Sequence, residues 1–112
     1  MLFPRIILAA LAAATAQARA NTSIRLYHDR HCKDEYRDIE VWVDTCATWI
    51  TPGWSSYRVM NYEVFTWINT FSRNACAGPV TSCADNTQFD CVPCYTDGGG
   101  SNAINSWATK LC

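Results

Sequence analysis

The segment Ile39-Glu40-Val41-Trp42-Val43 (IEVWV) alternates aliphatic residues with one charged and one aromatic residue. In a β-strand, successive side chains point to opposite faces of the sheet. Ile39, Val41 and Val43 would therefore share one face, and Glu40 and Trp42 would share the other. This pattern predicts a strand that is buried on one side only.

Three further segments are rich in β-branched and aromatic residues and are expected to be strands: Ser23–Tyr27, Ser56–Val59 and Glu63–Ile68. Two connecting segments, Thr45–Ile50 and Cys83–Phe89, have room for a short helical turn. Short strands at about ten-residue spacing predict an all-β protein, a small antiparallel sandwich or barrel. The expected turns are His28–Asp34, Thr51–Gly53, Ser72–Asn74, Ala77–Pro79 and Asp97–Asn102.

Residues 1–20 have the pattern of a secretory signal peptide. A basic residue precedes the apolar run Ile6–Ala14, and small residues at Ala18 and Ala20 mark a cleavage site. We expect residues 21–112 to form a single cysteine-rich β-domain that is secreted and acts in the extracellular space. This part carries 7 Lys and Arg against 10 Asp and Glu. It lacks the basic patch that nucleic-acid binding requires, and it has no membrane-spanning run of about 20 apolar residues.

All seven cysteines lie in the expected mature part. In an oxidising compartment six of them would pair, and each disulfide would contribute about 2–4 kcal/mol. The sequence leaves the pairing open. It also leaves open whether the seventh cysteine stays in a monomer or links a covalent dimer. Asn21 begins an N-glycosylation sequon and is a candidate glycan site. The disulfide candidates are Cys32, Cys46, Cys76, Cys83, Cys91, Cys94 and Cys112.

One sequence pattern occurs twice. Tyr27–Asp34 and Phe71–Gly78 each place a cysteine five residues after an aromatic residue, at an offset of 44, and Ser56 and Ser106 echo each other at an offset of 50. An aromatic residue at the base of a hairpin can cover the folded turn. Gly78 can adopt a positive φ there, and a late serine can hydrogen-bond the turn. The repeat predicts two units that close one sandwich together.

This repeated pattern resembles the Greek-key unit of the βγ-crystallin fold. It is similar to that of small cysteine-rich secreted proteins of filamentous fungi, among them effector candidates and killer-toxin-like proteins. The resemblance implies a sandwich of two Greek-key units. Asp34 stands where the family pattern has a glycine, and the odd cysteine count departs from full pairing. The residues that carry the resemblance are Tyr27, Cys32, Ser56, Phe71, Cys76, Gly78 and Ser106.

Many βγ-crystallin proteins bind calcium through a loop that resembles Asn/Asp-Asn/Asp-x-x-Ser/Thr-Ser. The corresponding segments here, Thr51–Ser56 and Ser101–Ser106, keep only Asn102, Ser106 and Ser56 as weak candidate ligands. Calcium prefers six to eight oxygen ligands, several of them carboxylates. We therefore expect the serines to stabilise hairpins and expect no metal or cofactor.

Two cysteine-containing motifs have structural interpretations. His28 and His31 precede Cys32 at a spacing that could hold zinc or copper, but exposed turn residues are the better interpretation. Cys91-Val92-Pro93-Cys94 resembles a redox motif, yet no helix pattern follows it to lower a thiol pKa. We expect these two cysteines to pair with different partners.

No catalytic set is evident, and the sequence does not predict an enzyme. Five carboxylates lie in Asp34–Asp44, interleaved with basic residues, which is typical of a solvated face. Glu40 and Asp44 would lie roughly 13 Å apart along a strand, too far for a glycosidase pair. Gly98–Gly100 lacks the features of a phosphate-binding loop.

Five tryptophans exceed what a small core needs. We expect Trp67 and Trp107 to belong to the core. Trp42 shares its strand face with a glutamate, which leaves both an exposed and a covered position open. Trp49 and Trp54 flank a predicted loop, and Trp54 is expected to be exposed. Exposed aromatic residues favour contact with a protein or a sugar.

These observations predict a secreted fungal effector-type protein that binds a host or competitor component, a protein or a glycan, outside the cell. This function rests on fold-level analogy. One alternative is a killer-toxin-like antimicrobial protein. Another is an inhibitor of a secreted hydrolase, in which the loop Thr51–Trp54 would enter an enzyme cleft.

Overall fold

The fold was analysed in a computed structural model that describes residues 21–48, 53–110 and 112. The expected signal peptide lies outside these residues. The described residues form strands and loops and contain no helix. The strands are β1 (Asn21–Tyr27), β2 (Glu35–Trp42), β3 (Cys46–Ala47), β4 (Ser56–Tyr62), β5 (Trp67–Arg73), β6 (Ala77–Asp85), β7 (Val92–Pro93), β8 (Tyr95–Thr96), β9 (Gly99–Gly100) and β10 (Ala103–Trp107).

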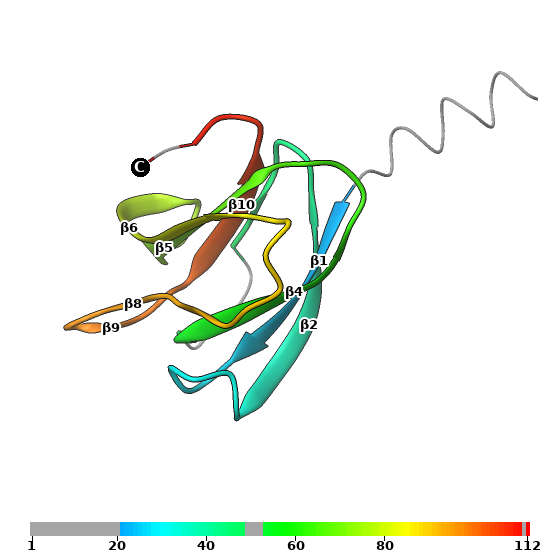
Figure 1. The fold of residues 1–112 in the computed structure, drawn as a ribbon. Coiled ribbons are helices and arrows are strands. Elements are labelled where there is room, and N and C mark those ends of the chain that lie inside the picture. Colours follow the sequence, from blue (N-terminus) through cyan, green and yellow to red (C-terminus); the bar gives the residue numbers. More distant parts are fainter. Residues whose placement is uncertain (1–20, 49–52, 111) are drawn as a thin grey trace, which may run out of the picture.

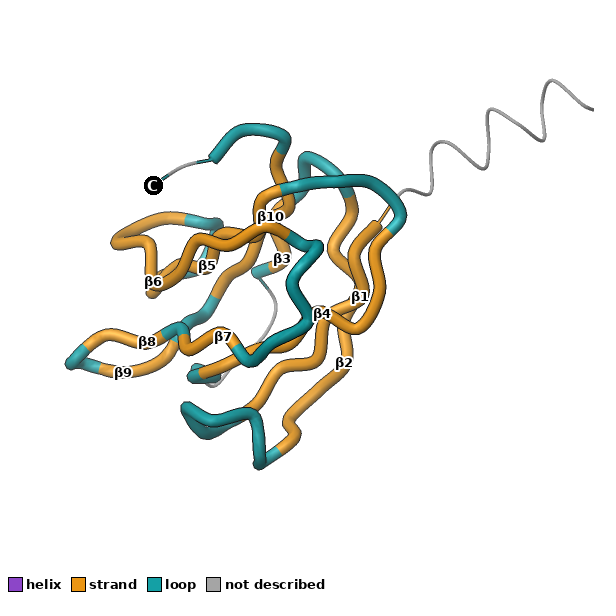
Figure 2. Tube along the Cα trace, in the orientation of Figure 1, coloured by secondary structure: helices purple, strands orange, loops and turns teal. Residues whose placement is uncertain are grey.

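The strands form two four-stranded antiparallel sheets, in the orders β2-β1-β4-β7 and β3-β10-β5-β6 (Figure 1). β8 and β9 form a separate small hairpin that projects from the body (Figure 2). Each half of the chain supplies three strands to one sheet and one short strand to the other. β3 leaves the first half for the second sheet, and β7 leaves the second half for the first sheet. The predicted all-β sandwich is confirmed at this level.

Four local predictions need correction: one strand, one turn and two helical turns. Only the last two residues of Glu63–Ile68 belong to a strand, β5, and the others form the loop after β4. Ala77–Pro79 is not a turn but the beginning of β6, at a free sheet edge where proline is tolerated. Neither Thr45–Ile50 nor Cys83–Phe89 forms a helical turn in its described residues, because Cys46–Ala47 is strand β3 and the start of the other segment completes β6.

The core lies between the two sheets, where aliphatic side chains of both meet. Ile39 and Val41 face this core, as the alternation in β2 predicts, while Glu40 and Trp42 are exposed. Full burial of each large aliphatic side chain stabilises the fold by roughly 1.5–3 kcal/mol. The core cluster is Ile24, Leu26, Ile39, Val41, Ala47, Trp54, Tyr57, Val59, Ile68, Cys94 and Ile104.

Two of the three disulfides occupy equivalent places in the two halves. Cys32, in the β1–β2 hairpin, bonds Cys91 next to β7, and Cys76, in the β5–β6 turn, bonds Cys46 in β3. Each therefore ties a hairpin to the short strand that the other half donates to the same sheet. Cys32 and Cys76 have left-handed φ values of 55° and 50°. The third disulfide joins β6 to the C-terminus through Cys83 and Cys112.

Ser56 stabilises the first hairpin in the way that the repeat predicts. Its Oγ accepts a hydrogen bond from the backbone N–H of Cys32 (3.1 Å) and donates to the carbonyl of Asp29 (2.6 Å). The Asp29 carboxylate holds the same turn, because it accepts hydrogen bonds from the backbone N–H groups of residues 31, 33 and 34. These donors, the N–H of Asp34 first, lower the pKa of Asp29.

The predicted equivalence of Ser56 and Ser106 is wrong. Ser56 pairs with Tyr27 across the sheet, and the residue that pairs with Phe71 in the second half is Ala103. Asn102 takes over the hydrogen bond instead, because its Nδ2 donates to the carbonyl of Ser72 (2.7 Å). The two halves share a topology but use different side chains to hold their turns.

Cys94 is the unpaired cysteine among the described residues, and it is fully buried. Burial raises the pKa of its thiol to about 12. Cys91 and Cys94 do not bond each other, in agreement with a structural interpretation of this motif, but Cys94 is a core residue and not a half-cystine. A covalent dimer through this thiol would require the core to open.

We expect a thiol reagent to leave the native protein unlabelled and to label it once after unfolding without reductant. The physical reason is that the nucleophilic thiolate of Cys94 is disfavoured and inaccessible in the core. Mass spectrometry measures the added labels and the gain of two hydrogens per disulfide on reduction. Labelling of more than one thiol in the unfolded, unreduced protein would contradict the three disulfides.

We expect Ser56→Ala to lower the free energy of unfolding by about 1–3 kcal/mol, because a partly buried N–H and a partly buried carbonyl lose their partner. Ser55→Ala is the matched control, since the described contacts of Ser55 are made by its backbone. Urea denaturation measures both variants. Equal stability of the two would show that the hairpin does not depend on the Ser56 hydroxyl.

Candidate functional site

The three weak calcium candidates are all used in internal hydrogen bonds. Ser56 and Asn102 bind the two turns described above, and the buried Ser106 Oγ donates to Thr66 Oγ1 (2.6 Å). Ser56 lies on β4 in the first sheet, and Ser106 lies on β10 in the second. This arrangement supports the interpretation that these residues stabilise the fold.

The histidines of the first hairpin lie at the surface. His28 stacks on Tyr36, with ring centroids 4.6 Å apart, and its Nδ1 lies 3.5 Å from a carboxylate oxygen of Asp34. His31 is exposed, and Cys32 is oxidised. Within residues 21–48, 53–110 and 112, no three His, Cys, Asp or Glu residues group in a way that could hold a metal ion.

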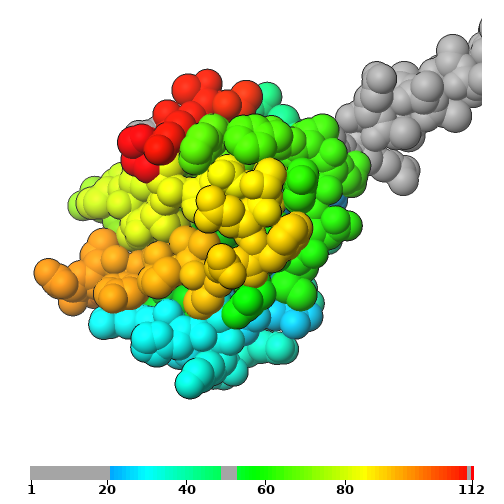
Figure 3. All heavy atoms as spheres, in the orientation of Figure 1, coloured from blue at the N-terminus to red at the C-terminus, as the bar shows by residue number. Residues whose placement is uncertain are grey.

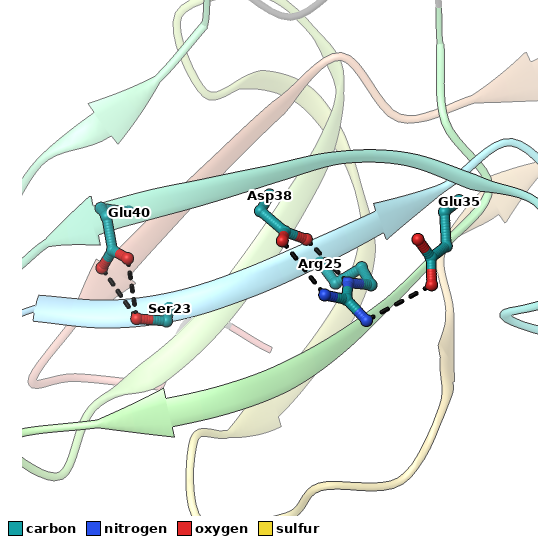
Figure 4. Close-up of polar contacts among 5 residues, drawn as sticks. All are labelled: Ser23, Arg25, Glu35, Asp38 and Glu40. Carbon is teal, nitrogen blue, oxygen red and sulfur yellow. Dashed lines mark hydrogen bonds and ion pairs between the residues drawn. The ribbon is translucent and has the colours of Figure 1, made fainter.

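The carboxylates of β2 take part in contacts along the outer face of the first sheet (Figure 4). Arg25 binds Asp38 through two hydrogen bonds of 2.8 and 3.1 Å and reaches Glu35 at 3.3 Å. The hydrogen bonds from Arg25 lower the pKa of Asp38. Glu40 accepts hydrogen bonds from Ser23 and from the amide of the glycan candidate Asn21. These contacts join the neighbouring strands β1 and β2.

Two tryptophan predictions are wrong, and both have a physical reason. Trp54 is fully buried, because its backbone pairs with Ser101 and brings it into the core. This approach requires Gly100, where a Cβ would lie 2.5 Å from the Trp54 carbonyl oxygen. Trp107, expected in the core, is 40% exposed because it ends β10 on the outward side.

The remaining tryptophans have different outcomes. Trp42 is 41% exposed, which settles the choice between an exposed and a covered position in favour of exposure. Trp67 is partly buried. Trp49 lies outside the described residues. In the loop Thr51–Trp54, which the hydrolase-inhibitor alternative invoked, the Trp54 side chain is inaccessible, and Thr51 and Pro52 lie outside the described residues.

The β2–β3 turn, the β4–β5 loop and the segment after β10 meet at one end of the sandwich (Figure 1). Four of the eight large exposed apolar side chains among the described residues lie in or next to these segments: Trp42, Val64, Phe65 and Trp107. The backbone N–H of Asp44 in the β2–β3 turn donates to the carbonyl of Ser106 (2.7 Å), which links the two sheets there. Figure 3 places the segment around residue 65 beside the C-terminal segment on the surface. We call this region the aromatic end; it comprises Trp42, Val64, Phe65, Trp67 and Trp107.

Trp67 lies at the centre of the aromatic end. It is the cross-strand partner of Trp107, and its ring contacts the ring of Phe65 edge to face, with centroids 5.9 Å apart. The ammonium group of Lys110 lies 4.9 Å from the Trp67 ring centroid, a cation–π contact. Phe65 and Trp107 are more exposed than Trp67 and so offer more ring surface to a ligand.

The loop that carries Val64 and Phe65 is held by one buried side chain, Asn86. Its Oδ1 accepts the N–H of Thr66 (3.0 Å), and its Nδ2 donates to the Val64 carbonyl (2.7 Å) and to Thr22 Oγ1 (2.9 Å). Its backbone N–H donates to the Thr66 carbonyl. Phe65, 54% exposed, is therefore flanked on both sides by residues fixed to the core.

The two ends of the sandwich differ in chemistry. At the aromatic end the exposed carboxylates Asp44 and Glu63 have no side-chain partner among the described residues, and Lys110 is the nearby cation. The opposite end carries the charged turn His28–Asp34 and the β8–β9 hairpin. The aromatic end therefore combines exposed ring faces with exposed carboxylate acceptors.

Sequence reasoning missed Phe65 and Asn86. Phe65 lies within the predicted strand Glu63–Ile68. In the structure Glu63, Val64 and Phe65 are all exposed, so this segment does not alternate between exposed and buried residues as a strand would. Asn86 lies in a segment rich in turn formers, where an asparagine is an ordinary turn residue. Its function depends on contacts with residues 20 or more positions away, and the sequence carries no signal for them.

We expect Asn86→Ala to lower the free energy of unfolding by about 2–4 kcal/mol, because several buried hydrogen bonds are lost together. Gln88→Ala, at an exposed position two residues further on, is the matched control. Denaturation measures stability, and hydrogen exchange measures the protection of residues 63–66. Unchanged protection of this loop in Asn86→Ala would contradict the role given to the side chain.

No family model matches the chain, and neither the curated proteins nor the solved structures contain a significant match. Within the part of the chain that the structure describes, no helix has the length and apolar character needed to cross a bilayer. The function is therefore argued from the residues of this chain and from their geometry.

Proposed function

We propose that this chain is a secreted, βγ-crystallin-like protein of the effector type, which acts outside the cell by binding a component of a host or of a competing organism. The aromatic end is the observation that carries the proposal. Large exposed aromatic residues favour recognition, because they bring much contact area at a small cost in conformational entropy.

The topology supports the fold assignment within this proposal. Each half orders its strands in the same way and donates one short strand to the sheet of the other half. A pair of Greek-key units with exchanged third strands has this arrangement. The equivalent disulfides Cys32–Cys91 and Cys46–Cys76 agree with a repeated unit.

Three disulfides support the extracellular location. Such bonds form and persist in oxidising compartments and stabilise small domains whose core is limited. The expected signal peptide, residues 1–20, would direct the chain there. Binding at the aromatic end uses no cofactor and requires no catalytic set.

The test compares the secreted wild-type protein with a Phe65→Ala/Trp107→Ala variant and with Tyr95→Ala. Tyr95 is 38% exposed and lies on β8, away from the aromatic end, so it is the matched control. We expect saturable retention by extracellular fluid or wall fractions of a host or competitor, lost in the double variant and kept in Tyr95→Ala.

Equal, non-saturable retention of all three proteins by every fraction would overturn the proposal. Growth inhibition of competing microbes by wild type and double variant alike would favour the killer-toxin-like alternative. That result would also place its activity away from the aromatic end.

A further inference from the structure

We propose that the aromatic end is a binding surface for an uncharged, β-linked polysaccharide, with Phe65 and Trp107 as the residues that stack on its sugar rings. This inference rests on the proposed extracellular binding function and names the chemical class of the partner. It combines three observations: the exposed rings, the carboxylates beside them and the fixed loop.

The rings supply the first part of the recognition. A β-linked chain presents flat faces of C–H groups, which pack against the electron-rich faces of aromatic rings. Phe65 and Trp107 are 54% and 40% exposed, and both lie beside Trp67. Lys110 lies over the Trp67 ring, so Trp67 supports the surface while its two neighbours offer ring surface to the ligand.

The carboxylates at this end favour a sugar as the ligand over a lipid bilayer. Asp44 and Glu63 are exposed, and no side chain among the described residues pairs with them. Carboxylates accept hydrogen bonds from sugar hydroxyl groups. The same carboxylates would lose their hydration on insertion into a bilayer, and they would repel a polyanionic glycan.

The loop that carries Phe65 is already ordered in the free protein, so binding would cost little conformational entropy. Asn86 fixes the residues on both sides of Phe65, and Ser106 Oγ, one residue before Trp107, donates to Thr66 in the same network. A surface that is already ordered in the free protein loses less entropy when it binds. A binding role for the loop would explain why the buried Asn86 side chain holds a loop whose apolar residues are exposed.

The experiment uses the disulfide-bonded protein made in the periplasm of a bacterium that adds no N-glycans, so that Asn21 carries no sugar. The probes are insoluble cellulose, chitin and β-1,3-glucan, followed by soluble hexasaccharides of whichever is bound, titrated against tryptophan fluorescence. Phe65→Ala and Trp107→Ala change exposed side chains, and circular dichroism and thermal unfolding verify that the fold is retained.

We expect saturable binding to at least one of these polysaccharides and a loss of affinity of about tenfold or more in the double variant, since buried aromatic contacts dominate such surfaces. Trp107→Phe is expected to retain most of the affinity, because it keeps a stacking ring. Tyr95→Ala, the matched control at the other end, is expected to bind as wild type does.

Three outcomes would overturn the inference: no binding to any of the three polysaccharides, equal loss in Tyr95→Ala and the double variant, or stronger binding to a polyanionic pectate. Binding to phosphatidylcholine vesicles in place of the polysaccharides would assign the surface to lipid. Retention of the wild type by a host protein fraction, without polysaccharide binding, would overturn this inference and leave the proposed extracellular binding function intact.

Discussion

The exchange of the short strands β3 and β7 is the constraint on which the rest of the structure depends. Each half forms three strands of its own sheet, and the fourth position is filled from the other half. β3 and β7 have only two residues each, so few backbone hydrogen bonds hold them in their sheets. Cys32–Cys91 and Cys46–Cys76 secure them by linking each to the hairpin of the sheet that it joins.

The two ends of the sandwich differ in the side chains that connect their strands. At one end the hairpin that contains Cys32 is folded by Ser56 and Asp29, and its polar residues face solvent. At the other end the sheets are joined by the contact from Asp44 to Ser106 and by the buried Asn86. At this second end, the segments that these hydrogen bonds hold carry the exposed apolar side chains. The two ends therefore differ in the residues that their connecting segments present to solvent.

The sequence predicts the class of fold well where a local period decides it. The alternation in Ile39–Val43 correctly places Ile39 and Val41 in the core, while it left both an exposed and a covered position open for Trp42. The pairing of cysteines and the failed equivalence of Ser56 and Ser106 lie beyond local pattern, because they depend on how distant strands align. The resemblance of the two halves is a resemblance of topology, and the hydrogen bonds that hold each turn have diverged.

The candidate site was predicted in part. Trp42 was named as a contact residue and is exposed, but Trp54 and Trp107 exchange the positions expected of them. A bridge to Ser101, in the last loop before β10, brings Trp54 inward, and the end of a strand leaves Trp107 outside. Hydrophobicity alone does not predict which of these tryptophans is buried. Their burial depends on where each lies relative to the strands and loops around it.

Phe65 gives the strongest reason to regard the aromatic end as functional. Phe65 contacts the ring of Trp67, yet about half of its surface stays exposed, and exposed apolar surface favours unwanted association. Here the loop is fixed by Asn86, and burying an amide is favourable only because its donors and acceptors are satisfied. These hydrogen bonds fix the backbone on both sides of Phe65. The structure therefore maintains an exposed ring at a defined position, as a binding surface requires.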